Sequence, residues 1–166
     1  MKQKIFSTFS AFFVALALNQ MAPVAATDTV PQRVADWVDA YQDFDLNRFL
    51  NFYADNVSFK DPTAGIDFPN KQALADAYSA IMQGRWGGDF RMDINSVVES
   101  DDTVVMEGIF SLSFNGEVAK MNFTTWLDFE DGLIVRQLDL FNYAALRRQI
   151  PTYGQGLPAE YTGPRD

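Results

Sequence analysis

The chain contains no cysteine and no histidine among its 166 residues. The absence of cysteine excludes disulfides and thiol nucleophiles, and the absence of histidine excludes Ser-His-Asp machinery and the usual zinc sites. We therefore expect neither a metal nor another cofactor. Any chemistry must use carboxylates, Tyr, Lys, Arg or hydroxyl groups.

Positive charge is also scarce, with 13 Lys and Arg residues against 22 Asp and Glu residues and a net charge of −9. An acidic chain without a basic cluster repels phosphate backbones and anionic lipid surfaces, so we expect no nucleic-acid partner. Aromatic residues, in contrast, are abundant: 15 Phe, 6 Tyr and 3 Trp. That content suffices for a large core and for an apolar cavity besides.

The first 26 residues have the pattern of a secretory signal peptide. Lys2 and Lys4 give a basic start, residues 5–18 are mostly apolar, and small residues at 24–26 offer a cleavage site before Thr27. A membrane anchor is the alternative, but the strictly apolar core is well short of the roughly 20 residues that a span needs. We therefore predict export to the periplasm or the medium, with no stable membrane anchor after cleavage.

Cleavage there would leave a small and more acidic chain. Lys2 and Lys4 are the only charges lost, so 140 residues remain, with 11 basic and 22 acidic residues and a net charge of −11. This length indicates one domain, over residues 27–150. Residues 151–166 are rich in Pro, Gly and Tyr and are predicted to form an extended or loosely attached tail.

Helical spacing of apolar residues predicts three helices in the first half of the chain. Their expected ranges are 30–43, 45–54 and 70–84, and Asp45 and Asn70 are the expected N-caps of the second and third helices. Between the second and third helices, Val57 and Phe59 alternate with polar residues as a short strand. Asp61-Pro62 ends that strand because proline cannot continue the ladder, and residues 63–69 are expected to form a loop.

The second half changes to the alternating pattern of strands. The expected strands are 90–100, 103–114, 117–130 and 133–141. Asn115-Gly116 and Asp131-Gly132 are strong hairpin turns. Even-numbered residues of the second of these strands and odd-numbered residues of the third form its apolar side, so they should face one core. Helices followed by a meander predict an α+β domain.

This order of elements resembles the cone-shaped fold of the nuclear transport factor 2 (NTF2) superfamily, and most closely its SnoaL-like and ketosteroid-isomerase-like branch. The residues that carry the resemblance are Asp45-Leu46, 52–57, Asp61-Pro62, 131–136 and 140–143. It covers about residues 30–149 and implies a curled antiparallel sheet wrapped around three N-terminal helices, with an internal apolar pocket. The same pattern occurs in isomerases, polyketide cyclases, dehydratases, epoxide hydrolases and proteins without known activity, so it is specific for fold but not for function.

The resemblance also suggests roles for individual residues. Asp61 falls on the general base of the isomerases, whereas their oxyanion Tyr falls on Trp37 and their second acidic donor falls near Thr125. Neither acidic donor is therefore kept, and Tyr41, one helical turn beyond Trp37, is our own substitute for the phenol. Asp139 resembles the final-strand Asp of limonene epoxide hydrolase, although the rest of that triad is missing. The acid–base Asp of the polyketide cyclases matches either Asp61 or Asp139.

Both carboxylates also have a purely structural interpretation. Asp61 can accept backbone N–H bonds in the turn to Thr63 and Ala64. Asp139 stands between two leucines, where a charge is costly unless it is paired. Its candidate partners are Arg91, Arg136 and Arg147. If both carboxylates instead face one apolar cavity, desolvation and repulsion should raise the pKa of at least one, giving an acid and a base from one residue type.

Further side chains are predicted to line this cavity, although each alone is more often a core residue. They are Trp37, Tyr78, Met82, Met106, Phe110, Met121, Phe123, Thr125, Gln137 and Phe141. Trp126 projects from the opposite face of the sheet. In the NTF2-like superfamily that outer face commonly pairs two chains, so we predict a homodimer.

Two functions follow from these expectations. The first is an exported isomerase, cyclase or hydrolase that acts on a small hydrophobic molecule with a carbonyl or hydroxyl group. In it, Asp61 would be the general base, Asp139 the acid or water-positioning group, and Tyr41 the donor to a developing oxyanion. The second is a periplasmic ligand-binding or dimeric interaction module in which the same pocket performs no chemistry.

Overall fold

The computed structural model describes residues 26–27, 30–82 and 89–153. Most of the predicted signal peptide, and the predicted tail beyond Tyr153, lie outside these ranges. Within them, no helix has the length and apolar character needed to cross a membrane.

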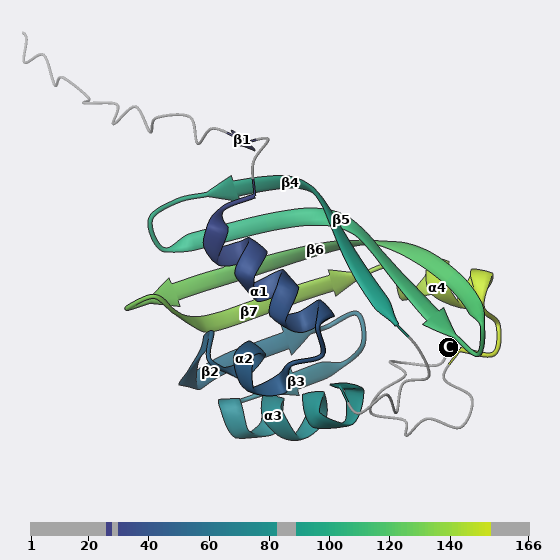
Figure 1. Cartoon of the computed structure of the whole chain (residues 1–166), viewed down its shortest axis with the longest axis horizontal. Helices are drawn as coiled ribbons and strands as arrows, with labels where there is room; N and C mark the ends of the chain where they lie inside the picture. The colour runs from purple at the N-terminus through teal and green to yellow at the C-terminus, as the bar shows by residue number, and fades with distance from the viewer. Residues whose placement is uncertain (1–25, 28–29, 83–88, 154–166) are drawn as a thin grey trace, which may run out of the picture.

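The chain folds into helices and one strongly curled sheet (Figure 1). The helices are α1 (Gln32–Gln42), α2 (Leu46–Leu50), α3 (Lys71–Ala80) and α4 (Tyr143–Gln149). The strands are β1 (Ala26–Thr27), β2 (Tyr53–Asp61), β3 (Ile66–Phe68), β4 (Phe90–Glu99), β5 (Thr103–Phe114), β6 (Glu117–Glu130) and β7 (Leu133–Phe141). This arrangement confirms the predicted α+β, NTF2-like architecture.

The sheet has the order β1-β4-β5-β6-β7-β2-β3. Its described pairs are antiparallel except for β2 and β7, which run parallel. Figure 1 shows α1 crossing one face of the sheet, with α2 and α3 below it. Helix α4 lies at the right of the view, near the end of β7 and the start of β6. The strand carrying Asp61 is thereby placed beside the last strand of the chain.

Local sequence accounts for the ends of these elements. The Asp45 carboxylate accepts a hydrogen bond from the Arg48 amide at 3.0 Å, and the Asn70 side chain accepts one from the Ala73 amide at 2.9 Å, so both predicted helix caps are confirmed. Asn115 and Asp131 adopt φ angles of 52° and 50°, and the glycine after each is also left-handed. These are the dihedral angles that favour tight hairpins.

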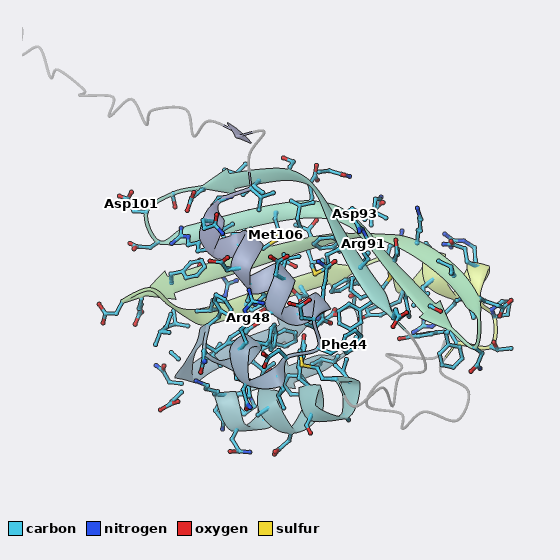
Figure 2. All side chains as sticks on the ribbon, viewed as in Figure 1. Phe44, Arg48, Arg91, Asp93, Asp101 and Met106 are labelled. Atoms are coloured by element: carbon cyan, nitrogen blue, oxygen red, sulfur yellow. The ribbon has the colours of Figure 1, made fainter. Side chains whose placement is uncertain are left out.

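The predicted core faces are also confirmed. Even-numbered residues of β5 from Val104 to Phe114 and odd-numbered residues of β6 from Ala119 to Phe129 are buried. Met106 is one of these inward-facing side chains and is fully buried (Figure 2). Together with the apolar face of α1, they form one continuous core.

Two expectations about local structure were wrong, and one helix was missed. Residues 53–56 belong to β2 and not to a helix and turn, because Tyr53 pairs with Ile134 of β7 and the Ile134 amide bonds to the Phe52 carbonyl at 2.8 Å. Part of the predicted loop forms β3, which pairs with the end of β2. Helix α4 was not predicted at all. In the first two cases, pairing between strands overrides the local pattern.

Gly108 marks a close approach between β4 and β5. It pairs with Ile94 on one side and Phe123 on the other, and the register of β4 shifts just beyond this point. A Cβ atom at position 108 would lie 2.1 Å from the carbonyl oxygen of Asp93 and 3.0 Å from the Phe123 ring. Only glycine fits here, and with the irregularity in β4 it lets the sheet bend over the helices.

The outer face of the sheet exposes apolar side chains. Trp126 and Leu140 are each 42% exposed. Trp126 pairs across the strands with Leu138, and Leu140 pairs with Thr124, so the exposed pair lies on one surface at the middle of the sheet. The predicted pairing of two chains through this surface remains a prediction.

Candidate active site

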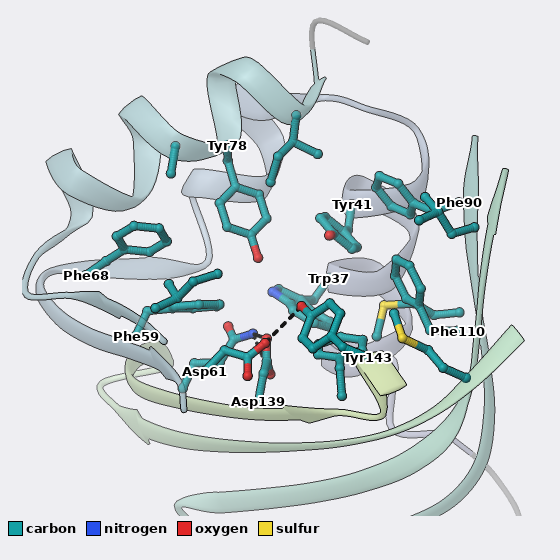
Figure 3. A pocket seen from close by; sticks show the side chains of 18 of the residues that line it. Trp37, Tyr41, Phe59, Asp61, Phe68, Tyr78, Phe90, Phe110, Asp139 and Tyr143 are labelled. Atoms are coloured by element: carbon teal, nitrogen blue, oxygen red, sulfur yellow. Dashed lines mark hydrogen bonds between the residues drawn. The ribbon is translucent and has the colours of Figure 1, made fainter. Parts of the chain in front are cut away.

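A cavity of about 70 Å³ lies between the concave face of the sheet and the helices. One water molecule needs roughly 10–15 Å³ of cavity volume measured in this way, so the cavity has room for about five waters. Aromatic side chains dominate its wall, as Figure 3 shows for Trp37, Tyr41, Tyr78, Phe110 and Tyr143. The polar groups among them include two carboxylates, Asp61 and Asp139.

The parallel pairing of β2 and β7 places these carboxylates side by side. The last pairs of the register are Phe59 with Gln137 and Lys60 with Leu138, and Asp61 and Asp139 are each one residue further along. Neighbouring strands lie about 4.8 Å apart, and residues in register point to the same face. Both carboxylates therefore enter the cavity together (Figure 3).

Asp61 is 2% exposed and accepts hydrogen bonds on both oxygens. Its Oδ1 accepts from the amides of Thr63 at 2.9 Å and Ala64 at 3.1 Å, and also from the Thr63 hydroxyl. Its Oδ2 accepts from the phenol of Tyr143 at 3.0 Å. The turn predicted as a structural role for Asp61 is thus present, and it coexists with a position in the cavity wall.

Tyr143 was missed as a site residue. It begins α4, whose N-cap Asn142 accepts a hydrogen bond from the Ala145 amide at 3.0 Å. Asn142 followed by residues with good helix propensity was a usable signal for this helix. From the first position of this helix, the Tyr143 side chain points into the cavity and its phenol contacts Asp61 (Figure 3).

Asp139 is 4% exposed and has only neutral hydrogen-bond donors among its described partners. The Thr125 hydroxyl donates to Oδ1 at 2.8 Å, and Gln137 Nε2 donates to Oδ1 at 3.0 Å and to Oδ2 at 2.9 Å. These donors lie on β6 and β7, so the sheet itself holds the carboxylate in place.

A buried chain of hydrogen bonds fixes the orientation of Gln137. Trp37 Nε1 donates to the Tyr53 phenol at 2.9 Å, and that phenol donates to Gln137 Oε1 at 2.6 Å. Because Oε1 is the acceptor in this contact, the amide nitrogen must point to Asp139. The indole N–H of Trp37 is already used by Tyr53, so it does not replace the oxyanion donor of the isomerases.

The alternative interpretation of Asp139, an ion pair with an arginine, finds no support among the described salt bridges. Arg91 pairs with Asp93 at 2.6 Å (Figure 2), and Arg136 pairs with Asp128 at 2.7 Å. Arg91 and Arg136 are exposed, whereas Arg147 is half-buried and lowers the pKa of Tyr153. A cation facing the aromatic cavity would itself have to be desolvated.

Burial sets the proton affinity of both carboxylates. Desolvation raises the pKa of Asp139 to about 7, against the hydrogen bonds from Gln137 and Thr125, and the charge of Asp61 raises it further. Desolvation also raises the pKa of Asp61, but hydrogen bonds from Thr63, Tyr143 and the backbone oppose it. Asp139 therefore holds a proton at neutral pH more readily than most carboxyl groups.

The phenols of the wall stay protonated. Desolvation raises the pKa of Tyr41, Tyr78 and Tyr143 above the ordinary value of 10.0, and nearby negative charge adds to this effect. Each phenol is consequently a hydrogen-bond donor at neutral pH. Tyr41 lines the cavity, as the proposed donor to an oxyanion must.

The structure brings many of the predicted site residues together in the wall. Besides Asp61, Asp139 and Tyr41, these are Trp37, Tyr78, Phe110, Met121, Gln137 and Phe141. The remaining predicted contacts, Met82, Met106, Phe123 and Thr125, are not part of the wall. Met106 and Phe123 pack in the core, Met82 packs against it, and Thr125 holds Asp139 from the sheet. The alternation along each strand identified which side chains face inward, but not which of them reach the cavity and which stay in the packed core.

In the part of the chain that the structure describes, no group of three or more His, Cys, Asp or Glu side chains is arranged so that it could hold a metal ion.

A curled sheet, covering helices and a cavity with paired carboxylates define an NTF2-like domain. The chain belongs to the SnoaL-like domain family, whose sequence profile matches residues 34–137. No curated protein sequence matches the chain.

Solved structures share this fold. A hypothetical protein with a ketosteroid isomerase-like fold from Catenulispora acidiphila, in complex with trimethylamine, has a TM-score of 0.66 and 18% identity, covering 81% of this chain and 99% of its own. An epoxide hydrolase of Mycobacterium tuberculosis, described as LEH-like, has a TM-score of 0.62 and 13% identity, with coverages of 74% and 89%. TerC, co-crystallised with polyporic acid, has a TM-score of 0.63 and 19% identity, with coverages of 72% and 96%. At these identities the likeness shows the fold alone.

Proposed function

We propose that this protein is an exported, cofactor-independent acid–base catalyst that acts on a small hydrophobic molecule with a carbonyl or hydroxyl group. The observation that carries the proposal is the placement of Asp61 and Asp139 side by side in one aromatic cavity. The two carboxylates accept different sets of hydrogen bonds, which gives them different pKa values. Acid–base catalysis needs such a difference, because one group must give a proton and the other must take one.

Asp61 is the better base of the two. Four hydrogen bonds stabilise its ionised form, and Oδ2 accepts only one of them, from Tyr143. A carboxylate oxygen has a second lone pair, so Oδ2 can still take a proton from a substrate. Asp61 would remove the proton from the carbon next to a carbonyl group, and the electron pair of that C–H bond would form the enol.

Asp139 is the better acid. Its pKa of about 7 leaves much of it protonated at neutral pH. It would donate that proton to the carbonyl oxygen as the enol forms, and Tyr41 can donate a further hydrogen bond to the same oxygen. In a substrate with a conjugated double bond, Asp61 would return its proton to the far carbon of the dienol, and the O–H proton would return to Asp139, which completes an isomerisation. Attack of the enol on a second carbonyl would instead form a ring, with the new alkoxide taking the proton from Asp61 and the enol O–H proton returning to Asp139. Hydrolysis is a third reaction that we include in the proposal, because one protein of similar fold is described as an LEH-like epoxide hydrolase.

Exchange of hydrogen for deuterium tests this proposal without a known substrate. A panel of small ketones that fit the cavity, such as acetone and 2-butanone, is incubated with the protein in heavy water and followed by NMR. We expect exchange next to the carbonyl of at least one ketone, with Asp61→Asn and Asp139→Asn each slowing it at least about a hundredfold. Exchange should also slow as the pH rises above about 7, because Asp139 then loses its proton.

Asp67→Asn is the matched control, since Asp67 is an exposed carboxylate on β3 that pairs with Lys60 outside the cavity. It should leave exchange unchanged. Exchange at the rate of buffer alone for every ketone, or equal rates for wild type and Asp61→Asn, would contradict the proposal. The second function, ligand binding without chemistry, would then be favoured. One observation already supports it: the Trp37 indole N–H donates to the Tyr53 phenol and so cannot serve as an oxyanion donor.

We also propose that two chains pair through the outer face of the sheet. The exposed Trp126 and Leu140 at its centre support this arrangement, because apolar side chains gathered on one surface favour association. Leu140→Glu should convert a dimer to a monomer in sedimentation velocity experiments. Leu133→Glu, a similar change at the start of β7 and seven residues from Leu140, should not. A monomeric wild-type protein at micromolar concentration would refute the proposal.

A further inference from the structure

The cavity contains two acidic groups and, among the described residues of its wall, neither Lys nor Arg. All the described hydrogen-bond donors to Asp61 and Asp139 are neutral: backbone amides, hydroxyls and the Gln137 amide. Buried carboxylates are normally paired with a cation or neutralised by a proton. In this cavity, a bound cation could stabilise both carboxylates at once.

The rest of the wall also suits a cation. The rings of Tyr41 and Tyr78 lie 5.6 Å apart, and Tyr41 and Phe90 lie 4.3 Å apart, on the side of the cavity opposite the acids (Figure 3). Aromatic faces attract ammonium groups, most strongly where water is excluded, and cages of such rings recognise methylated amines. The net charge of −9 adds a field that draws cations toward the protein.

The size of the cavity limits the ligand. A volume of about 70 Å³ holds about five waters, and so a molecule or group with a similar number of non-hydrogen atoms. A trimethylammonium or tetramethylammonium group is of this size. A large polar cation such as a guanidinium on a long chain would leave most of its chain outside the cavity.

We propose that this cavity binds a small organic cation, a protonated or quaternary amine, between the Asp61 and Asp139 carboxylates and the aromatic rings of Tyr41 and Tyr78. The inference rests on the ligand-binding role of the cavity within the proposed function and names the class of ligand. A substrate would then carry an amine close to its carbonyl or hydroxyl group, beside the two carboxylates that move the proton.

The proposal implies a definite pH dependence of binding. Asp139 is faced by Asp61 from β2 and by the phenols of Tyr41, Tyr53, Tyr78 and Tyr143, which stay neutral in the relevant range. The cation Arg147 lies close enough to Tyr153, another residue of the cavity wall, to lower its pKa. Since only the ionised carboxylate attracts an ammonium group, affinity for a permanently charged ligand should rise as the pH increases through about 7.

Titrations followed by NMR with tetramethylammonium chloride and with tert-butanol test the inference. The two molecules have the same number of non-hydrogen atoms and similar shapes, but only the first is charged, and its charge does not change with pH. At pH 8 and constant ionic strength, the wild-type protein should bind tetramethylammonium at least about tenfold more tightly than tert-butanol. Affinity for tert-butanol should be the same at pH 6 and pH 8.

The carboxylate variants complete the experiment. Asp61→Asn and Asp139→Asn should each weaken tetramethylammonium binding by about tenfold and leave tert-butanol binding nearly unchanged. Asp67→Asn should behave as the wild type, since this exposed carboxylate lies outside the cavity wall. If Asp139→Asn does not fold, the pH series on the wild type and the Asp61→Asn titration still decide the matter.

Equal or tighter binding of tert-butanol, or an affinity for tetramethylammonium that does not change with pH or with Asp61→Asn, would overturn the inference. Failure here leaves the proposed catalysis standing if ketone exchange is observed. Conversely, tight tetramethylammonium binding without any exchange would support the ligand class and refute the catalysis. The two experiments therefore fail separately.

Discussion

The protein should lose about 4 kcal/mol of stability through Asp139 alone between about pH 4 and pH 8. The pKa of Asp139 is about 7 in the folded protein, against an ordinary value of 3.8 that applies to the unfolded chain. Because the folded state binds the proton more tightly, this contribution is fully present below about pH 4 and is lost as the pH rises through about 7. Each pKa unit corresponds to about 1.4 kcal/mol.

Urea unfolding of the wild type and of Asp139→Asn across this pH range measures the effect. Asparagine does not titrate, so the stability difference between the two proteins should change by about 4 kcal/mol in favour of the variant as the pH rises. The raised pKa of Asp61 acts in the same direction in both proteins and largely cancels in the comparison, except for its repulsion of the Asp139 charge, which the variant lacks. Parallel pH profiles for the two proteins would show that the Asp139 carboxyl titrates normally.

Gly108→Ala should destabilise the protein by about 3 kcal/mol. The added methyl group would lie 2.1 Å from the carbonyl oxygen of Asp93, which belongs to the backbone and cannot rotate away. Strands β4 and β5 would have to separate where the sheet bends, which disturbs their register on both sides of the irregularity. Thermal or urea unfolding gives the measurement.

Gly116→Ala is the control for this change. Gly116 also has a conformation that favours glycine, with φ of 82°, but a Cβ atom there would meet nothing within 4 Å. It should cost only about 1 kcal/mol, the usual penalty for a left-handed alanine. Similar losses for the two variants would show that the contact with Asp93 is relieved by a small shift of the strands.

The parts of the fold that depend on neighbouring residues in the sequence were predicted correctly. The turns at Asn115-Gly116 and Asp131-Gly132, the caps at Asp45 and Asn70, and the inward faces of β5 and β6 all depend on residues close together in the chain. Residues 53–56 were misassigned because their strand exists only through pairing with β7, some 80 residues later. No local preference records such a partner.

The candidate site was predictable in its carboxylates but not in its partners. Asp61 was found from the proline that follows it, and Asp139 from a charge between two leucines. Their donors come from elsewhere: Tyr143 from an unpredicted helix, and the Tyr53 phenol from a residue expected on a helix. Strand parity placed Gln137 and Asp139 on one face, but only the packed structure shows that Gln137 is oriented by Tyr53 and bonded to Asp139.

The parallel pairing of β2 with β7 also determines when the cavity can exist. Asp61 is synthesised early, whereas its neighbour Asp139 lies on the last strand, so a nascent or truncated chain that ends before β7 has one carboxylate and no wall beside it. The long loop that this pairing closes costs chain entropy that is recovered only when both strands dock. The contacts that create the site should therefore be among the last to form, so the paired carboxylates should come together only when β7 has docked on β2.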